Sequence, residues 1–372
     1  MRRLRPRSLD SIHQVDVRSS ARTYPVLIAS GLLKNAGELI QSRIHATRVL
    51  VVSDRNVTRH HGTALKQSLA KAGLEIQRWT SLPPGERSKT LATARSLYEA
   101  WIQAGADRGS VVVAFGGGVV GDVAGFAAST FLRGVPIVHV PTTVISQVDS
   151  AVGGKTGVNF DHAKNLIGTF HPPSLVIMDP VLFTTLSDRD FRAGWVESVK
   201  MGITLRRDLF ELVERHTDSV LARDAKLLED LVAISVEAKS EIVSRDERDE
   251  DVRAILNYGH TVGHAVEGAY RGRLRHGEAV AVGMNAAAWL AEELGISAGD
   301  VRDRQNRCLH ALGLKLVLPD ADKGAISRNL KLDKKVRDKK IRVVLTLQIG
   351  SASVWPHISS RLLRTAVRVV TS

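Results

Sequence analysis

The segment from Ser110 to Ser129 constrains the fold more than any other part of the chain. Its apolar run SVVVAF (Ser110–Phe115) ends in the glycine turn GGGVVG and continues into a helix-forming stretch of small residues. A buried strand that leads through a glycine turn into a helix is typical of α/β folds with a parallel sheet. Ligands of such folds bind at the carboxyl ends of the strands. The sequence therefore predicts an α/β domain with a ligand site at this turn.

Similar strand and helix patterns fill the first half of the chain. Val49–Asp54 and Pro136–Thr143 are further short apolar runs, and helical stretches are expected around Gly62–Gly73 and over Thr90–Ala104. From about Asp188 helical patterns dominate, and only Ile341–Leu347 and Ala352–Trp355 indicate strands. We therefore predict an N-terminal α/β nucleotide-binding domain with a parallel sheet over residues 1–180. A mostly α-helical, metal- and substrate-binding C-terminal domain follows over residues 181–372, and residues 1–20 are expected to form a flexible basic tail.

Composition excludes several classes of protein. The chain has 372 residues and a single cysteine, Cys308, which excludes an internal disulfide and a four-cysteine zinc site. Cys308 lies in the helical stretch Val301–Leu312, where we expect a core residue. No run of 18 apolar residues is present, so we expect no membrane span. The N-terminus lacks the apolar region of a secretory signal, which favours a cytoplasmic location, with a short organelle-targeting segment as the alternative to a basic tail.

The formal net charge is +13. Basic residues cluster over Arg2–Arg7 and Lys331–Lys340, but no basic region is interleaved with aromatic residues. We therefore expect no nucleic-acid partner. An anionic small molecule would also call for cations.

The glycine turn matches a phosphate-binding pattern. Gly116, Gly118 and Gly121 form G-x-G-x-x-G between a strand and a helix, which lets a pyrophosphate approach N–H groups at the helix N-terminus. In the usual fingerprint an acidic residue follows about 20 residues later. Here the candidate acid, Asp54, ends an earlier strand, so we predict a nucleotide site built in a different order. The alternative is a glycine-rich helix that packs closely on the sheet.

Three histidines and one glutamate suit a divalent metal such as zinc. His260 and His264 are four residues apart, which places both on one face of a helix. His276 begins another apolar helical stretch, and Glu197 lies upstream in GWVESVK. The spacing does not decide which histidines bind, and one of them could serve as an acid–base group.

Several cations and amides lie where an anion would need them. Lys239 shares a helix face with Val232, Val236 and Val243, so it either extends to water or points at an anion. Lys155 in VGGKTG, and Lys164 and Asn165 in AKNLIG, are predicted to lie in loops that contact phosphate or carboxylate groups, or to be solvated surface residues. Arg253 and Asn257 lie about one helical turn apart just before His260. Convergence of these groups would indicate a substrate with more than one negative group.

Five motifs in order resemble one known family. They are FGGGVVGDVAGFAAST, PTTVISQVDSAVGGKTGVN, KNLIGTFHPP, LNYGHTVGHAVE and HGEAVAVGM. Together they resemble the 3-dehydroquinate synthases, members of the sugar-phosphate cyclase superfamily, over roughly Val49–Gly350. Two segments depart from the family pattern, GWVESVKMGIT around Glu197 and Lys200, and FHPP, but both keep the main chemical groups.

The resemblance implies a lyase of the shikimate pathway, which leads to chorismate and the aromatic amino acids. The substrate would be 3-deoxy-D-arabino-heptulosonate 7-phosphate, and the products 3-dehydroquinate and phosphate. Bound NAD+ would oxidise the substrate transiently, phosphate would be eliminated, the ketone would be reduced again, and an intramolecular aldol reaction would close the ring. The resemblance also implies a divalent zinc or cobalt ion and a homodimer.

The resemblance carries roles to individual residues. The metal ligands would be Glu197, His260 and His276, leaving His264 to face the substrate. Phosphate contacts would come from Lys155, Asn165, Asn257, His264 and either Lys334 or Lys335. The substrate carboxylate would meet Lys239 and Arg253, with Arg133 from a neighbouring subunit as a further candidate, and Asp149 and Lys200 would contact ring hydroxyls. Together with the glycine turn, the NAD contacts would be Asp54, Asn56, Glu86, Lys89, Gly117, Gly118, Asp122, Thr142, Thr143 and Lys164.

Three alternatives stay open. A sister cyclase could make aminodehydroquinate, 2-deoxy-scyllo-inosose or a valiolone-type product with the same NAD and metal chemistry. A glycerol-dehydrogenase-like enzyme would carry out a net redox reaction and accumulate NADH. A binding protein without catalysis would need a damaged site, whereas Glu197, His260, His264, His276 and Lys155 are all present.

Overall fold

The computed structural model describes residues 12–161, 163–336 and 342–372, without the side chains of residues 331–336. Two compact units emerge. One comprises Met1–Leu186 together with Leu228–Arg248, and the other comprises Ser187–Leu227 together with Asp249–Ser372. The predicted domain boundary between residues 180 and 181 stays a prediction. The compact units differ from it mainly in that Leu228–Arg248 belongs with the first unit.

The first unit is built on a seven-stranded sheet with the strand order β1-β2-β9-β6-β5-β3-β4. Only β1 is antiparallel to its neighbour, and every other pair is parallel. The strands are β1 (His13–Arg18), β2 (Thr23–Ile28), β3 (Arg48–Asp54), β4 (Glu75–Leu82), β5 (Val111–Gly116), β6 (Ile137–Pro141) and β9 (Leu175–Met178). The predicted α/β domain with a largely parallel sheet is confirmed.

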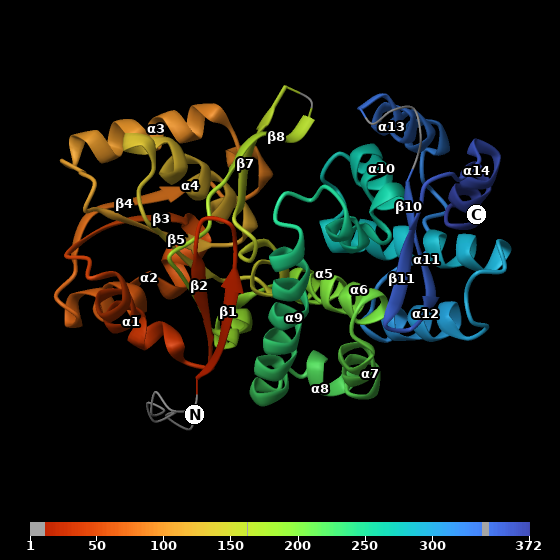
Figure 1. Ribbon diagram of the computed structural model, residues 1–372, viewed down its shortest axis with the longest axis horizontal. Helices are drawn as coiled ribbons and strands as arrows, with labels where there is room; N and C mark the ends of the chain where they lie inside the picture. The colour runs from red at the N-terminus through yellow and green to blue at the C-terminus, as the bar shows by residue number, and fades with distance from the viewer. Residues whose placement is uncertain (1–11, 162, 337–341) are drawn as a thin grey trace. The chain divides into compact units, whose positions relative to one another are not determined.

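Helices cover both faces of this sheet (Figure 1). Alternate residues of the central strands point to opposite faces, so Val111, Val113 and Phe115 belong to one apolar core, and Val112 and Ala114 to the other. Residues of α1 and α2 complete the first core, and those of α3 and α4 the second. The helices of this unit are α1 (Ala36–Ile44), α2 (Arg55–Lys71), α3 (Leu91–Gln103), α4 (Gly118–Thr130) and most of α9 (Ala225–Arg245), with 3-10 turns η2 (Leu32–Asn35), η3 (Glu86–Ser88), η4 (Phe131–Arg133) and η6 (Pro180–Thr185), and a π turn, η5 (Ser146–Ser150).

Two expectations about this unit are corrected. Residues 13–18 form β1, which pairs with β2, so the predicted tail over residues 1–20 does not extend this far; residues 1–11 lie outside the described part. The segments around Lys155 and Asn165 are not loops. They form the antiparallel hairpin β7 (Lys155–Phe160) and β8 (Ala163–Phe170). Most of β8 is exposed, so it lacks the apolar run that marks a buried strand.

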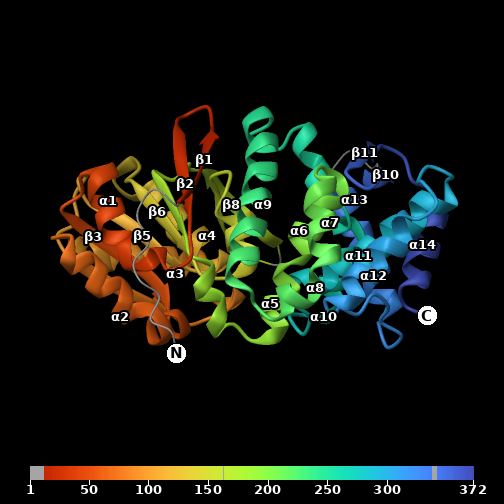
Figure 2. The same ribbon diagram turned by 90° about the horizontal axis from the view of Figure 1, so that it is seen from below.

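The second unit is mainly helical, as predicted, and Figure 2 shows its helices from below. The 18-residue helix α11 is buried along most of its length, which matches its apolar sequence. Cys308 is buried on α12, and burial raises the pKa of its thiol to about 12, so it is a core residue. The elements are α5 (Asp188–Gly194), α6 (Val196–Thr204), α7 (Arg207–Arg215), α8 (Thr217–Leu221), η7 (Val252–Asn257), α10 (His260–Tyr270), α11 (His276–Glu293), α12 (Val301–Ala311), α13 (Lys323–Val336), α14 (Ser360–Val369) and the hairpin β10 (Val343–Gln348) with β11 (Ser351–Trp355).

Within the described residues, no helix combines the length and the apolar character that a membrane crossing requires.

Candidate functional site

A histidine cluster lies in the second unit. His260 and His264 lie one turn apart on α10, and His276 is the first residue of α11. The nitrogen atoms that these three rings offer lie within 4.8 Å of one another. The imidazole centroids are 5.0 Å apart for His260 and His264, and 5.4 Å apart for His260 and His276. Residues 16 positions apart in sequence therefore converge on one point.

The buried carboxylate of Glu197 on α6 faces two of these rings. Its Oε1 atom lies 3.5 Å from Nε2 of His276 and 3.9 Å from Nε2 of His260. Within the described part of the chain, no donor makes a hydrogen bond of normal geometry to this buried oxygen. The other carboxylate oxygen pairs with Lys200, three residues further along the same helix. An oxygen in this position has the place and the chemistry of a metal ligand.

The opposite nitrogens of the same two rings have their own contacts. Nδ1 of His260 lies 3.1 Å from the carbonyl oxygen of Tyr258, and Nδ1 of His276 lies 3.5 Å from Oε2 of Glu267. Because a carbonyl or carboxylate oxygen only accepts, both contacts favour a proton on Nδ1. In the neutral ring of His260, Nε2 then keeps its lone pair toward Glu197, which is the tautomer that a metal ligand needs, whereas Nε2 of His276 would have to give up its proton before it could bind a metal ion.

The charges of the cluster are strongly coupled. Burial by itself would raise the pKa of Glu197, but the charge of Lys200 and the contacts with His276 and His260 hold it well below its usual range. Burial, together with the charge of Lys200, lowers the pKa of His260 to about 3. Burial also works against protonation of His276, but the carboxylates of Glu197 and Glu267 raise its pKa to about 9. The cluster thus holds an ionised carboxylate and a neutral imidazole near pH 7.

Close backbone packing places His260. Gly259, just before it, has φ +77°, a conformation that favours glycine. A side chain at Gly283 on α11 would put its Cβ only 1.9 Å from the carbonyl oxygen of Gly259. The start of α10 therefore lies directly against the backbone of α11, which also carries His276.

The residues present fit a divalent cation. Two imidazole nitrogens, one buried carboxylate oxygen and a further histidine nearby make a donor set of the kind zinc and cobalt accept. The structure brings together all four residues that the sequence singled out. The three histidines on their own also form a compact group, so these four residues contain two candidate sets of three ligands.

Other predicted substrate residues of this unit lie on neighbouring elements. Lys200 is buried on α6, Arg253 is buried on η7, and Asn257 is half-buried at the end of η7. Lys334 and Lys335 lie near the end of α13, and their side chains lie outside the described part.

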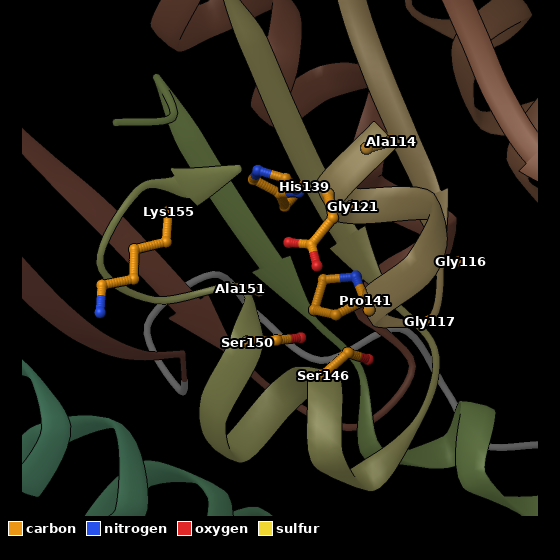
Figure 3. A pocket seen from close by; sticks show the side chains of 12 residues that line it. Ala114, Gly116, Gly117, Gly121, His139, Pro141, Ser146, Ser150, Ala151 and Lys155 are labelled. Atoms are coloured by element: carbon orange, nitrogen blue, oxygen red, sulfur yellow. The ribbon is translucent and has the colours of Figure 1, made fainter. Parts of the chain in front are cut away.

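The glycine turn of the first unit borders a pocket, which Figure 3 shows at close range. α4 begins at Gly118, and the turn before it forms part of the wall. A side chain at either of the first two glycines would crowd a neighbouring residue. A Cβ at Gly116 would lie 2.6 Å from Val120, and one at Gly117 would lie 3.1 Å from Thr143. The pocket is lined by Ala114, Gly116, Gly117, Gly118, Gly121, Asp122, His139, Pro141, Ser146, Ser150, Ala151 and Lys155.

The sequence analysis missed three polar residues of this pocket. Ser146 and Ser150 come from the π turn η5, and His139 comes from β6. Burial lowers the pKa of His139 to about 4, so its ring is neutral near pH 7. Side chains alternate between the two faces of a strand, and this alternation along β6 is the signal that could have found His139. The residue points at the helix after the glycine turn, since a Cβ at Gly121 would lie 3.5 Å from Nδ1 of His139.

The remaining predicted cofactor residues lie on several elements of the same unit. Asp54 caps α2 by accepting hydrogen bonds from the backbone N–H groups of Asn56 and Val57, at 2.8 Å and 3.0 Å. Lys89 is buried and pairs with Asp122, whose pKa is raised by burial although Lys89 opposes the shift. Thr142 is buried, and Thr143 donates a hydrogen bond of 2.8 Å to Ser146. Glu86 belongs to η3, and Lys164 is exposed on β8.

Of the two alternatives for Lys239, water or an anion, the structure shows an anion of the chain itself. Its Nζ donates to the backbone carbonyl and to Oδ1 of Asp149, each at 2.5 Å. Asp149 lies in η5, whose neighbouring residues Ser146 and Ser150 line the glycine pocket. The structure therefore joins two residues that the resemblance placed separately on the substrate. Arg133 is exposed at the end of η4 with φ +69°.

Comparison with known proteins connects both units to one family. A family model described as "3-dehydroquinate synthase N-terminal" matches residues 79–193, and one described as "3-dehydroquinate synthase C-terminal" matches residues 194–336. A 3-dehydroquinate synthase of Nostoc punctiforme is 42% identical over 354 residues, covering 94% of this chain and 97% of the relative. That of Symbiobacterium thermophilum is 44% identical over 344 residues, covering 92% of this chain and 96% of the relative.

Solved structures show the same architecture. A 2-deoxy-scyllo-inosose synthase complexed with carbaglucose-6-phosphate, NAD+ and Co2+ superposes with a TM-score of 0.87 at 28% identity, covering 96% of this chain and all of the other. ValA, the 2-epi-5-epi-valiolone synthase of Streptomyces hygroscopicus with NAD+ and Zn2+ bound, gives a TM-score of 0.86 at 29% identity, covering 95% and 99% of the two chains. An NADH-dependent butanol dehydrogenase of Thermotoga maritima, at 16% identity and a TM-score of 0.67, shares the fold.

Proposed function

The chain belongs to the 3-dehydroquinate synthase family, and from this membership we propose that it converts 3-deoxy-D-arabino-heptulosonate 7-phosphate to 3-dehydroquinate and phosphate with NAD+ and one divalent metal ion. The observation that carries the proposal is the meeting of Glu197 with His260 and His276. A chain that had kept only the fold would have no reason to maintain this buried donor set.

Glu197, His260 and His276 would hold the metal ion, zinc or cobalt. When bound, such an ion supplies Lewis-acid polarisation of a substrate hydroxyl. Lys200 neutralises the second oxygen of Glu197, which keeps the buried carboxylate ionised and fixed in position. This leaves His264, the most exposed of the three histidines, to face the substrate and exchange protons with it.

The other residues of the second unit supply charge and hydrogen bonds. Arg253 presents a guanidinium, which recognises a planar carboxylate with two parallel hydrogen bonds. Asn257 would donate its amide to the phosphate group, and one of Lys334 and Lys335 would add a charge there. The departing phosphate can act as the base for its own elimination, so these residues mainly position the substrate.

The first unit would hold the dinucleotide at the glycine turn. When bound, NAD+ takes up a hydride and returns it, so it is not consumed. The start of α4 presents backbone N–H groups, which suit a pyrophosphate. The further contacts would be Asp54, Asn56, Glu86, Lys89, Asp122, Thr142, Thr143 and Lys164.

Asp149, Lys155, Asn165 and Lys239 complete the proposed substrate set. Lys155 lines the glycine pocket and suits a phosphate oxygen. The pairing of Lys239 with Asp149 holds its ammonium in place before any substrate carboxylate arrives. A homodimer, in which Arg133 reaches the substrate of the neighbouring subunit, and a cytoplasmic location are further parts of the proposal.

Phosphate release from 3-deoxy-D-arabino-heptulosonate 7-phosphate tests this function, with NADH absorbance followed in the same cuvette. We expect phosphate release with catalytic amounts of NAD+ and no steady NADH signal. NADH that accumulates in proportion to turnover would instead identify a dehydrogenase. If the metal- and NAD-loaded chain released no phosphate, or turned over sedoheptulose 7-phosphate equally well, the sister-cyclase alternative would replace the proposal.

A further inference from the structure

Asn159, near the end of β7, connects three residues that the proposed function assigns to two different ligands. Its Nδ2 donates to Oε1 of Glu86 at 2.8 Å, and its Oδ1 accepts from the backbone N–H of Asn165 at 2.9 Å. Its own backbone N–H donates to the carbonyl oxygen of Lys89, also at 2.9 Å. Glu86 and Lys89 are proposed contacts of NAD+, and Asn165 is a proposed contact of the substrate phosphate.

The two hydrogen bonds of the side chain fix the orientation of its amide. A carboxylate oxygen only accepts and a backbone N–H only donates, so a flipped amide would lose both bonds. Each end of the Asn159 side chain therefore has a separate partner. Asp could keep the bond to Asn165 but would place a second carboxylate beside Glu86.

Both partners lie beside or at a positive φ angle in short or exposed segments. Glu86 begins a three-residue 3-10 turn directly after Gly85, which has φ +97°. Asn165 has φ +54° on the largely exposed strand β8. Asn tolerates the left-handed region better than most residues, and contacts from its surroundings further stabilise that conformation. The hydrogen bond from Asn159 is one such contact.

We infer that Asn159 is a positioning residue that couples binding of the cofactor to recognition of the substrate phosphate group. The inference rests on the proposed function. A Glu86 side chain held by the cofactor also holds the amide of Asn159, and that amide fixes the backbone of Asn165. By linkage the coupling is reciprocal, so phosphate bound at Asn165 also stabilises the cofactor-bound position of Glu86.

The test separates the two ends of the side chain. N159D keeps the acceptor for Asn165 and adds repulsion at Glu86, so we expect the Kd for NAD+ to rise about tenfold. The KM for the sugar phosphate, measured at saturating NAD+, should change less than about twofold, because the bond to Asn165 remains. N159A removes both bonds, so we expect it to raise the Kd for NAD+ and the KM together, each by about threefold or more.

E86Q provides the matched background. In the double variant N159D/E86Q the donor and the acceptor are exchanged, so the hydrogen bond forms again. We expect its Kd for NAD+ to lie within about twofold of the value for E86Q alone, which is the rescue that a merely structural role would not give. Thermal unfolding of each variant shows that it is folded.

Equal effects of N159D on NAD+ affinity in both backgrounds would overturn the inference, as would an N159A variant with unchanged Kd and KM. If the wild-type chain bound NAD+ without turning over the sugar phosphate, the proposed function would fail, and NAD+ titrations with and without inorganic phosphate would still decide the inference, which predicts tighter NAD+ binding with phosphate present in the wild type but not in N159A. A wild-type chain without NAD+ affinity would overturn both.

Discussion

Lys200 illustrates how single residues set the chemistry of the second unit. An isolated carboxyl group as deeply buried as Glu197 would be protonated near pH 7, because burial penalises its charge. The ammonium of Lys200 on the next helical turn reverses this preference. The remaining oxygen then faces Nε2 of His260 and of His276 as an anion. One lysine thereby keeps a buried acid ionised, in the form that a metal ion would need.

His276→Ala tests the ligand assignment. Loss of one of three protein ligands should weaken zinc or cobalt binding by more than about 100-fold, since loss of an outer-shell partner alone costs 10–100-fold. Metal content after gel filtration, measured by mass spectrometry, should fall together with turnover. His264→Ala is the matched comparison, and there we expect the metal to stay while turnover falls. If His276→Ala kept its metal and His264→Ala lost it, the roles of the two histidines would be exchanged.

Glu267 provides a second test at the level of residues. Its carboxylate lies 3.5 Å from Nδ1 of His276 and fixes the ring with Nε2 toward Glu197. We expect Glu267→Ala to lower the affinity for Co2+ by about 10- to 100-fold. Glu267→Gln keeps an acceptor without the charge, so its loss should be smaller. Titration with Co2+ followed by visible absorbance measures both, and equal affinities in the wild type and the alanine variant would contradict this positioning role.

Individual elements show how far the sequence predicts this fold. β5 and α4 could be predicted because an apolar run, a glycine turn and a small-residue helix follow each other without interruption. The convergence of His260, His264 and His276 was partly predictable, because the four-residue spacing is a local property. The hairpin of β7 and β8 was not, since exposed strands do not carry a core pattern. The pairing of Lys239 with Asp149 was not predictable either, because it joins residues 90 positions apart in the chain.

The contact between α10 and α11 supports a prediction about whole elements. Gly283→Ala would place a methyl group 1.9 Å from the carbonyl oxygen of Gly259, so the start of α10 must move away from α11. We expect a loss of about 1–3 kcal/mol in the free energy of unfolding, as for other overpacked cores, together with weaker metal binding. Urea unfolding and metal titration measure the two effects.

Gly299→Ala is the control for this change. The added methyl group at position 299 meets no atom within 4 Å, so stability and metal affinity should both stay close to the wild type. A Gly283→Ala variant as stable as this control would show that the two helices can separate without cost.

At the scale of the whole molecule, the proposed cofactor and metal residues belong to different compact units. The glycine turn and its pocket belong to the first unit, and the histidine cluster belongs to the second. The chain enters the second unit at Ser187, returns to the first over Leu228–Arg248, and then completes the second. The periodicity of the sequence predicts the helix α9, but it does not show with which unit that helix packs. The return of the chain to the first unit could therefore not be predicted.

Because the proposed metal and cofactor residues belong to different units, we expect metal removal to abolish turnover but not NAD+ binding. Chelation should abolish turnover, and added zinc or cobalt should restore it, because the donor set of Glu197, His260 and His276 would lose its ion. A metal that binds only the folded chain stabilises it by about 2.7 kcal/mol at a free concentration of 100 times its Kd, so calorimetry should show a lower Tm after chelation.

NAD+ affinity measured on the chelated chain should stay within about threefold of the loaded chain, since a coupling free energy of about 0.7 kcal/mol or less is expected between sites that share no residue. Full turnover at a metal content far below one ion per chain would contradict the metal proposal, whereas loss of NAD+ binding on chelation would show that the two units do not bind their ligands independently.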